Sequence, residues 1–326
     1  AIDITLNGIA GDGSDTTIGI DLDAFTYTSS AGTNTVQGLN IGNLTEAGAG
    51  ATTSTAINIG SGWDTDISAT GTISAGDFTC TDCLDFTEFD ADRAEVLGRA
   101  LNSGINQFIV PGVSVATWPR ARALAQAYDC VSVSYGLHPY FIAQSEDFTE
   151  DVLLQWASSF ECIAVGECGI DATQPNLPKQ MEIFEQHISV ANKTQKPLIV
   201  HHRKSHHHIM SCFKRVKPEF GGTIHAFSGS LQDAEKYINL GFKLGCGGTI
   251  SYDRSNKTRK VFEQIDLKHI VLETDAPDMP LHGYQGQRNE PSRIANIAAI
   301  LAELRQLDVE EVAKVTAQNT RDVFSI

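Results

Sequence analysis

The stretch LIVHHR at residues 198–203 decides the fold of this chain. Its three apolar residues suit a short buried strand, and the three polar residues after them mark the point where the chain leaves the core. From residue 77 onward the same order recurs: a short apolar strand runs into a polar loop and then into an amphipathic helix. Such alternation is typical of a parallel sheet covered by helices.

Short apolar segments of this kind occur at eight places along the chain. The predicted strands are Phe78–Asp82, Gln107–Val110, Val131–Tyr135, Ile163–Gly166, Leu198–His201, Thr223–His225, Lys243–Cys246 and Ile270–Glu273. Helical periodicity lies between them, for example at Arg93–Ser103, Trp118–Tyr128, Gln180–Lys193, Leu231–Leu240 and Arg293–Leu304. Eight repeats in about 250 residues predict an α/β fold closed into a (β/α)8 TIM barrel. The count of eight argues against the alternative, an open doubly wound sheet.

Residues 1–79 differ in composition from the rest of the chain. They are rich in Gly, Thr, Ser, Ala and Asn, and they contain nine acidic residues but no Lys or Arg. Apolar triplets such as residues 39–41 and 57–59 stand between turn-forming residues, which indicates either short β-strands or a flexible low-complexity extension. We therefore predict two parts, a Gly/Thr-rich extension at residues 1–76 and a barrel at residues 77–326.

The net charge of −16 argues against a protein that binds nucleic acid through a broad basic face. A phosphate-bearing substrate would instead be attracted by bound divalent ions and a local group of cations. The seven cysteines are scattered and odd in number, which does not suggest a disulfide framework. No apolar run reaches membrane-spanning length and no secretion signal is evident. The sequence thus predicts a cytoplasmic protein without membrane contact, and we expect a monomer.

Polar residues gather where the predicted strands end, which is where barrels of this kind carry their active sites. Glu167, His201, His225 and Asp275 follow four different strands. One such residue alone is explained equally well by a strand cap or a loop contact. Two imidazoles and two carboxylates in one barrel mouth are typical ligands of Zn²⁺, Mn²⁺ or a similar divalent ion. The sequence therefore predicts a metal site.

This set of ligands predicts hydrolysis. A carboxylate can bridge two ions, a role that we assign to Glu167, and a metal-bound water is a usable nucleophile near neutral pH. Asp275 is expected to bind metal and to accept a proton from that water as the general base. Arg203 is expected to clamp a phosphate or carboxylate of the substrate, although a surface ion pair explains it nearly as well.

At these residues the sequence resembles the TatD-type deoxyribonucleases of the metal-dependent amidohydrolase superfamily. The resemblance runs from about residue 84 to the C-terminus and rests on motifs in the family's order and spacing: GLHP (136–139), GECGID (166–171), IVHHR (199–203), IHAFSG (224–229), GCGG (245–248) and LETDAPDMP (272–280). The segment from Glu273 to Gln287 is most similar to the subgroup of uncharacterised TatD-like metallohydrolases. The resemblance implies a hydrolase that uses two divalent ions (Zn²⁺, Mg²⁺ or Mn²⁺) and acts on DNA or a smaller phosphate ester.

The resemblance also implies roles for individual residues. Glu167 would bridge the two ions, His201 and His225 would complete one site, and Asp275 would belong to the other. His138 of the GLHP motif would line the substrate pocket.

One family feature is absent from this chain. The family's first strand ends in a His-x-His pair before Leu-Asp-Phe, and here Thr81 and Cys83 occupy the two histidine positions. A Cys83 thiolate, or Asp82 after a small register shift, offers one ligand but does not restore two imidazoles. We therefore expect the site of Asp275 to be incomplete, with one ion bound instead of two. The loss coincides with the change in composition, as in a gene fusion, a misassembled reading frame or an acquired domain.

Two other functions stay open. An impaired barrel that binds a ligand or partner, with residues 1–79 as a β-rich tether, would explain the missing histidines. Hydrolysis of an amide or a lactone would use the same metal ligands, because a fold alone does not fix the substrate.

A few further residues are interpreted more simply. The CxxC pair Cys80 and Cys83 is taken as a coincidence, and Cys168 and Cys246 as small buried apolar residues. His206 is expected near the substrate. The loop Ser251–Arg259 carries three cations that suit either a phosphate or an ordinary solvated loop.

Overall fold

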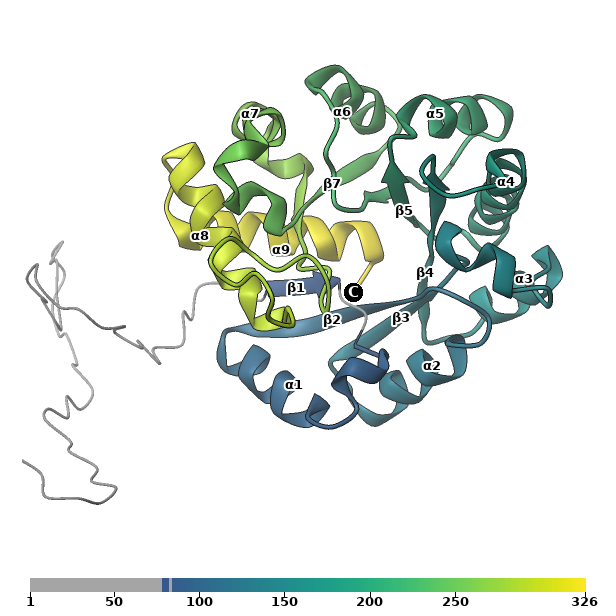
Figure 1. Ribbon diagram of the computed structural model, residues 1–326, viewed down its shortest axis with the longest axis horizontal. Coiled ribbons are helices and arrows are strands. Elements are labelled where there is room, and N and C mark those ends of the chain that lie inside the picture. Colours follow the sequence, from purple (N-terminus) through teal and green to yellow (C-terminus); the bar gives the residue numbers. More distant parts are fainter. Residues whose placement is uncertain (1–77, 82–83) are drawn as a thin grey trace, which may run out of the picture. The chain divides into compact units, whose positions relative to one another are not determined.

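The computed structural model describes residues 78–81 and 84–326, with side chains from residue 84 onward. Over this part of the chain, strands form a central ring with helices around it (Figure 1). The strands are β1 (Phe78–Thr81), β2 (Ile105–Gly112), β3 (Val131–Tyr135), β4 (Cys162–Asp171), β5 (Leu198–Arg203), β6 (Gly222–Ile224), β7 (Phe242–Cys246) and β8 (Ile270–Leu272). The α-helices are α1 (Arg93–Asn102), α2 (Trp118–Ala127), α3 (Glu150–Ala157), α4 (Leu177–Thr194), α5 (His206–Arg215), α6 (Leu231–Ile238), α7 (Asn256–Gln264), α8 (Ile294–Arg305) and α9 (Val309–Phe324).

The sheet has the order that the sequence predicts for a barrel. Its eight strands pair in parallel from β1 to β8 without any change of order, and β8 also lies against β1. A doubly wound sheet would reverse its strand order near the centre, so that alternative is wrong. The TIM-barrel prediction is confirmed. Because every strand is parallel, all the C-terminal ends face the same side of the ring.

Strand β4 is longer than predicted. It continues through Glu167 to Asp171, and its register against β5 shifts between Val165 and Cys168. Gly169 has φ 148°, and a Cβ at this position would lie 2.1 Å from the carbonyl oxygen of His201. The glycine therefore lets β4 approach β5 closely, and the local irregularity re-aims the side chain of Glu167, as β-bulges next to active sites do.

Helix α9, which the predicted helices did not include, packs against β1, β6 and β8. Its Phe324 forms a small apolar cluster with Ile109 of β2, Ala164 of β4 and Ile199 of β5. Ala164 and Ile199 lie near the starts of their strands, so α9 covers the end of the barrel opposite to the predicted site. The predicted extension at residues 1–76 and its boundary with the barrel lie outside the described residues.

The segment that follows β1 buries a carboxyl group. Asp85 is 2% exposed, and neither of its side-chain oxygens has a hydrogen-bond partner among the described residues. Arg93 and Arg120 lie nearby, but they donate to the carbonyl oxygens of Leu84 and Asp85 and pair with the carboxylate of Asp90. Burial consequently raises the pKa of Asp85 to about 7.

This buried group predicts a change of stability with pH. The pKa of Asp85 is about 7 in the folded chain against 3.8 for an ordinary aspartate, so the folded state favours the proton, and stability is lost as pH rises from about 4 to about 7. We expect Asp85→Asn to remove this loss, which amounts to at most about 4 kcal/mol. Urea unfolding of parent and variant at pH 5 and pH 8 measures it, with the exposed Asp129→Asn as the control. An equal response of both proteins to pH would contradict the prediction.

Candidate metal centre

Five side chains from five strands meet at the C-terminal end of the barrel. Glu167 lies within β4 and His201 within β5, whereas His138, His225 and Asp275 follow β3, β6 and β8 by a few residues. All four predicted metal ligands are therefore at the same end of the barrel, together with the predicted substrate residue His138.

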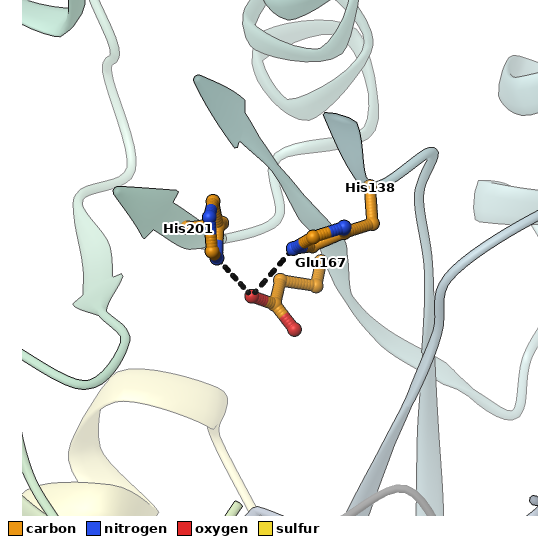
Figure 2. A group of neighbouring side chains, drawn as sticks. All are labelled: His138, Glu167 and His201. Carbon is orange, nitrogen blue, oxygen red and sulfur yellow. Dashed lines mark hydrogen bonds and ion pairs between the residues drawn. The ribbon is translucent and has the colours of Figure 1, made fainter. Parts of the chain in front are cut away.

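Three of these residues form a tight group. Nδ1 of His201 lies 3.1 Å from Oε1 of Glu167, and Nε2 of His138 lies 3.8 Å from the same oxygen (Figure 2). The two imidazole rings meet edge to face with their centroids 4.2 Å apart. One nitrogen of each histidine and one oxygen of Glu167 all lie within 4.8 Å of one another. We call His138, Glu167 and His201 the ligand triad.

The ligand triad has the chemistry of a divalent metal site. Although burial raises the pKa of Glu167, the charge of His225 and the hydrogen bond from His201 outweigh burial and lower it, so the carboxylate is charged. Burial, aided by His201, lowers the pKa of His138 to about 4, so this ring is neutral at physiological pH. Nε2 of His201 is buried without a hydrogen-bond partner among the described residues. A charged carboxylate beside an imidazole nitrogen that has no partner in the described part of the chain offers the donors that Zn²⁺ and similar ions take.

His225 and Asp275 form a second group beside the ligand triad. Nε2 of His225 lies 2.8 Å from Oδ1 of Asp275. Its other nitrogen, Nδ1, lies 2.9 Å from Oε2 of Glu273, whose Oε1 accepts the backbone N–H of Ala226 at 2.5 Å. Burial lowers the pKa of His225, but the carboxylates of Glu273, Glu167 and Asp275 outweigh burial and raise it well above its ordinary value. His225 is thus held between carboxylates on both sides of its ring.

Glu273 is a residue to which the sequence reasoning gave no role. It is 2% exposed, and the space for its carboxylate exists because residue 245 is a glycine. A Cβ on Gly245 would stand 2.3 Å from Oε2 of Glu273. The sequence did carry one sign of a role for Glu273: it is a charged residue two positions before Asp275, and the adjacent strand β7 has a glycine, Gly245, opposite it. Its partner could not be read from the sequence, because Glu273 and His225 lie on different strands.

The geometry groups the predicted ligands differently from the family resemblance. The resemblance joined Glu167, His201 and His225, whereas direct contacts here join Glu167 and His201 with His138, and His225 with Asp275. The charge of His225 nevertheless lowers the pKa of Glu167, which is consistent with a position of Glu167 between the two groups. The assignment of each ligand to an ion remains a prediction.

The loop that carries His138 is fixed from helix α4. The backbone N–H of Leu137 donates to Nε2 of His187 at 2.9 Å, and Nδ1 of His187 lies 2.7 Å from the carbonyl oxygen of Ile183. Burial lowers the pKa of His187 to about 4, which keeps its Nε2 available as an acceptor. Nδ1 of His138 accepts the N–H of Tyr140, so the proton of the neutral ring is on Nε2, which faces Glu167 at 3.8 Å. Nothing in the sequence indicated this role for His187, because in the predicted helix Gln180–Lys193 it is only one polar residue among several.

Arg203 lies at the end of β5 with 63% of its side chain exposed. Its Nη1 is 3.9 Å from Oδ2 of Asp171, which is itself buried and accepts two hydrogen bonds from Thr173 at its other oxygen. This long ion pair orients Arg203 loosely, and its exposed guanidinium can also contact another anion. Its role as a substrate clamp stays a prediction.

The remaining candidates lie away from the ligand triad. The ring of His206 lies tilted against that of His202 of β5 at 4.4 Å, and its Nδ1 is 3.0 Å from the hydroxyl of Tyr237 of α6. Cys168 and Cys246 are fully buried, and burial raises the pKa of both thiols, as expected of small core residues. The segment Ser251–Arg259 is not the predicted loop, because helix α7 begins at Asn256, and Arg259 of this helix donates to the carbonyl oxygen of Ile250. The side chains of Thr81, Asp82 and Cys83 lie outside the description.

Among the described residues, no helix has both the length and the apolar character needed to cross a membrane.

Comparison with known proteins agrees with the fold. The family described as TatD related DNase matches residues 82–325. YjjV of Escherichia coli, an uncharacterised metal-dependent hydrolase, is 37% identical over 254 residues, which cover 76% of this chain and 98% of YjjV. The crystal structure of YjjV superposes with a TM-score of 0.73 at 36% identity, covering 76% of this chain and 98% of that one.

A further relative carries a named activity. The 3′-5′ ssDNA/RNA exonuclease TatD of Citrobacter koseri is 28% identical over 251 residues, covering 74% of this chain and 96% of that protein. The matches cover nearly the whole length of these relatives. This chain therefore belongs to the TatD-related DNase family.

Proposed function

We propose that this chain is a divalent metal-dependent hydrolase that cleaves phosphodiester bonds in single-stranded nucleic acid, with DNA as the first substrate to test. The single observation that carries the proposal is the ligand triad, in which a buried carboxylate lies between two imidazoles at the mouth of the barrel. The relative from Citrobacter koseri, an ssDNA/RNA exonuclease by name, supports the choice of substrate. A smaller phosphate ester is the alternative substrate.

The residues divide the work as follows. Glu167 and His201 would hold one divalent ion, with His138 beside them in the substrate pocket, and Glu167, His225 and Asp275 would contribute to a second. A bound ion polarises a phosphoryl oxygen and lowers the pKa of a water molecule, which makes that water a nucleophile near neutral pH. Asp275, whose Oδ1 is 2.8 Å from Nε2 of His225, accepts the proton of the attacking water. Glu273 orients His225 through its Nδ1, the nitrogen that does not face Asp275. Arg203 binds a phosphate of the substrate.

The number of ions is the part of the proposal most open to measurement. Thr81 and Cys83 stand where the family resemblance puts two histidines, so we propose one tightly bound ion and a weak second site. Zn²⁺, Mn²⁺ and Mg²⁺ are the candidates. A monomeric state and a cytoplasmic location remain predictions.

The test combines metal analysis with a nuclease assay. The full chain is reconstituted with Zn²⁺, Mn²⁺ or Mg²⁺, its bound metal is counted, and the release of nucleotides from a single-stranded oligonucleotide is measured. The double variant Thr81→His/Cys83→His is measured in parallel. We expect about one ion and slow hydrolysis in the parent, and two ions with at least about tenfold faster hydrolysis in the variant. If neither protein retains metal or cleaves the oligonucleotide, the proposal is wrong.

The second candidate function is an impaired barrel that only binds its ligand. The loss of both first-strand histidine positions favours it. In that case the parent would bind single-stranded DNA without cleaving it under any of the three metals, and the double variant would not gain activity.

A further inference from the structure

An exposed tyrosine stands next to the ligand triad. Tyr140 is 58% exposed and lies two residues after His138, in the short 3₁₀ helix Pro139–Gln144. Among the described residues, Phe160 and Phe220 are the other exposed aromatic rings of this kind. Both precede a strand, so they lie at the opposite end of the barrel. Tyr140 is thus an apolar ring that solvent reaches on the functional side of the molecule.

Tyr140 is joined to the ligand triad by a series of ring contacts. Its ring meets that of Phe141 edge to face at 5.2 Å, and Phe141 meets His138 edge to face at 6.2 Å. His138 in turn meets His201 at 4.2 Å. The rings form a continuous path from the ligand triad to the exposed tyrosine, so a substrate whose phosphate lies at the ligand triad has Tyr140 within reach of its neighbouring nucleotide.

The backbone beneath Tyr140 is fixed. Its N–H donates to Nδ1 of His138 at 3.2 Å, and the N–H of Phe141 donates to the carbonyl oxygen of His138 at 2.9 Å. Pro139 is buried, and Leu137 is held by His187. A tyrosine on such a turn loses little conformational entropy when it contacts a ligand, because it has only two side-chain torsions.

We propose that Tyr140 is a stacking platform for an unpaired nucleobase next to the phosphodiester bond that is cleaved. The ligand class is single-stranded polynucleotide: bases in a duplex are already stacked on each other, whereas a free base can lie on an aromatic ring. Arg203 ends β5, whereas the loop of Tyr140 follows β3, so the two residues lie on either side of β4 and Glu167. Arg203 supplies a charged contact to a phosphate. This assignment rests on the proposed function. It adds that Tyr140 makes the enzyme prefer single-stranded nucleic acid to phosphodiesters that lack an unpaired base.

Binding without cleavage tests the platform. A fluorescein-labelled oligothymidylate is titrated with the full chain in EDTA, and its anisotropy gives the dissociation constant. A second oligonucleotide of equal length carries abasic residues instead of bases, and a third is fully paired in a duplex. We expect Tyr140→Ala to weaken binding of the first about 5- to 150-fold, which is the range for losing one base-aromatic stack. Binding of the abasic strand and of the duplex should stay within about twofold.

Two further variants identify the cause. Tyr140→Phe keeps the ring and should bind like the parent, and Phe160→Ala removes an exposed ring at the other end of the barrel and should also bind like the parent. Equal weakening of the normal and abasic strands by Tyr140→Ala would overturn the platform, and so would no weakening at all. The steady-state assay adds a separate readout, in which Tyr140→Ala raises KM for the oligonucleotide while kcat is kept. Because the anisotropy arm needs no catalysis, a chain that binds but does not cleave would refute the proposed function and still decide the role of Tyr140.

Discussion

Replacing Glu167 with Gln is expected to abolish metal-dependent hydrolysis, with a fall in kcat/KM of more than about 100-fold. The loss should exceed the 10- to 100-fold typical for a residue that only supports a metal ligand, because Glu167 is itself a proposed ligand. The carboxylate is 5% exposed and lies 3.1 Å from His201 and 3.8 Å from His138. An amide of the same size fills the space but carries no charge to balance a divalent ion.

The experiment has two readouts that separate binding from chemistry. Competition with a chromogenic chelator gives the affinity for Zn²⁺, and nucleotide release gives the rate. Glu182→Gln, which removes an exposed carboxylate on α4, is the matched control and should behave like the parent. If Glu167→Gln keeps the metal content and the rate of the parent, then the ligand triad is not the catalytic centre.

Replacing Glu273 with Gln is expected to lower the metal affinity of the site by about 10- to 100-fold. In the parent, the Glu273 carboxylate lies 2.9 Å from Nδ1 of His225, which favours a proton on Nδ1 and leaves Nε2 to face Asp275 and a metal ion. A glutamine amide can donate to Nδ1 instead, which favours the tautomer with the proton on Nε2. That nitrogen can then no longer bind metal.

A second variant displaces the same carboxylate without removing it. Gly245→Ala would place a Cβ 2.3 Å from Oε2 of Glu273, so the carboxylate must move away from His225. Both variants should lose affinity for Zn²⁺, and nitrogen-15 chemical shifts of His225 in the metal-free protein, followed against pH, should report a lower pKa than in the parent because the charge of Glu273 is lost or displaced. The exposed Glu263→Gln serves as control. Parent-like shifts and affinity in Glu273→Gln would show that the contact has no influence on the ligand.

The fold followed from local patterns because it depends on features that repeat. Strands β3 (Val131–Tyr135) and α-helical segments such as α4 (Leu177–Thr194) were read from apolar periodicity, and the predicted strand at 131–135 matches the observed bounds. The extent of β4 was predicted less well. Its irregularity at residues 166–168 depends on how closely it approaches β5, a contact between segments about 30 residues apart that periodicity does not record.

The site, too, has features that follow from the local sequence and features that depend on how distant segments pack. By itself, the sequence determined that Glu167, His201, His225 and Asp275 share one end of a barrel, because parallel strands in a ring leave all their C-terminal ends on one side. Only the tertiary structure decided which atoms meet: His138 with Glu167, Glu273 behind His225, and His187 under the loop of His138. Strand position is set by local periodicity, whereas contacts of about 3 Å depend on register, side-chain rotamers and glycines in neighbouring strands, all of which are fixed only when distant segments pack together.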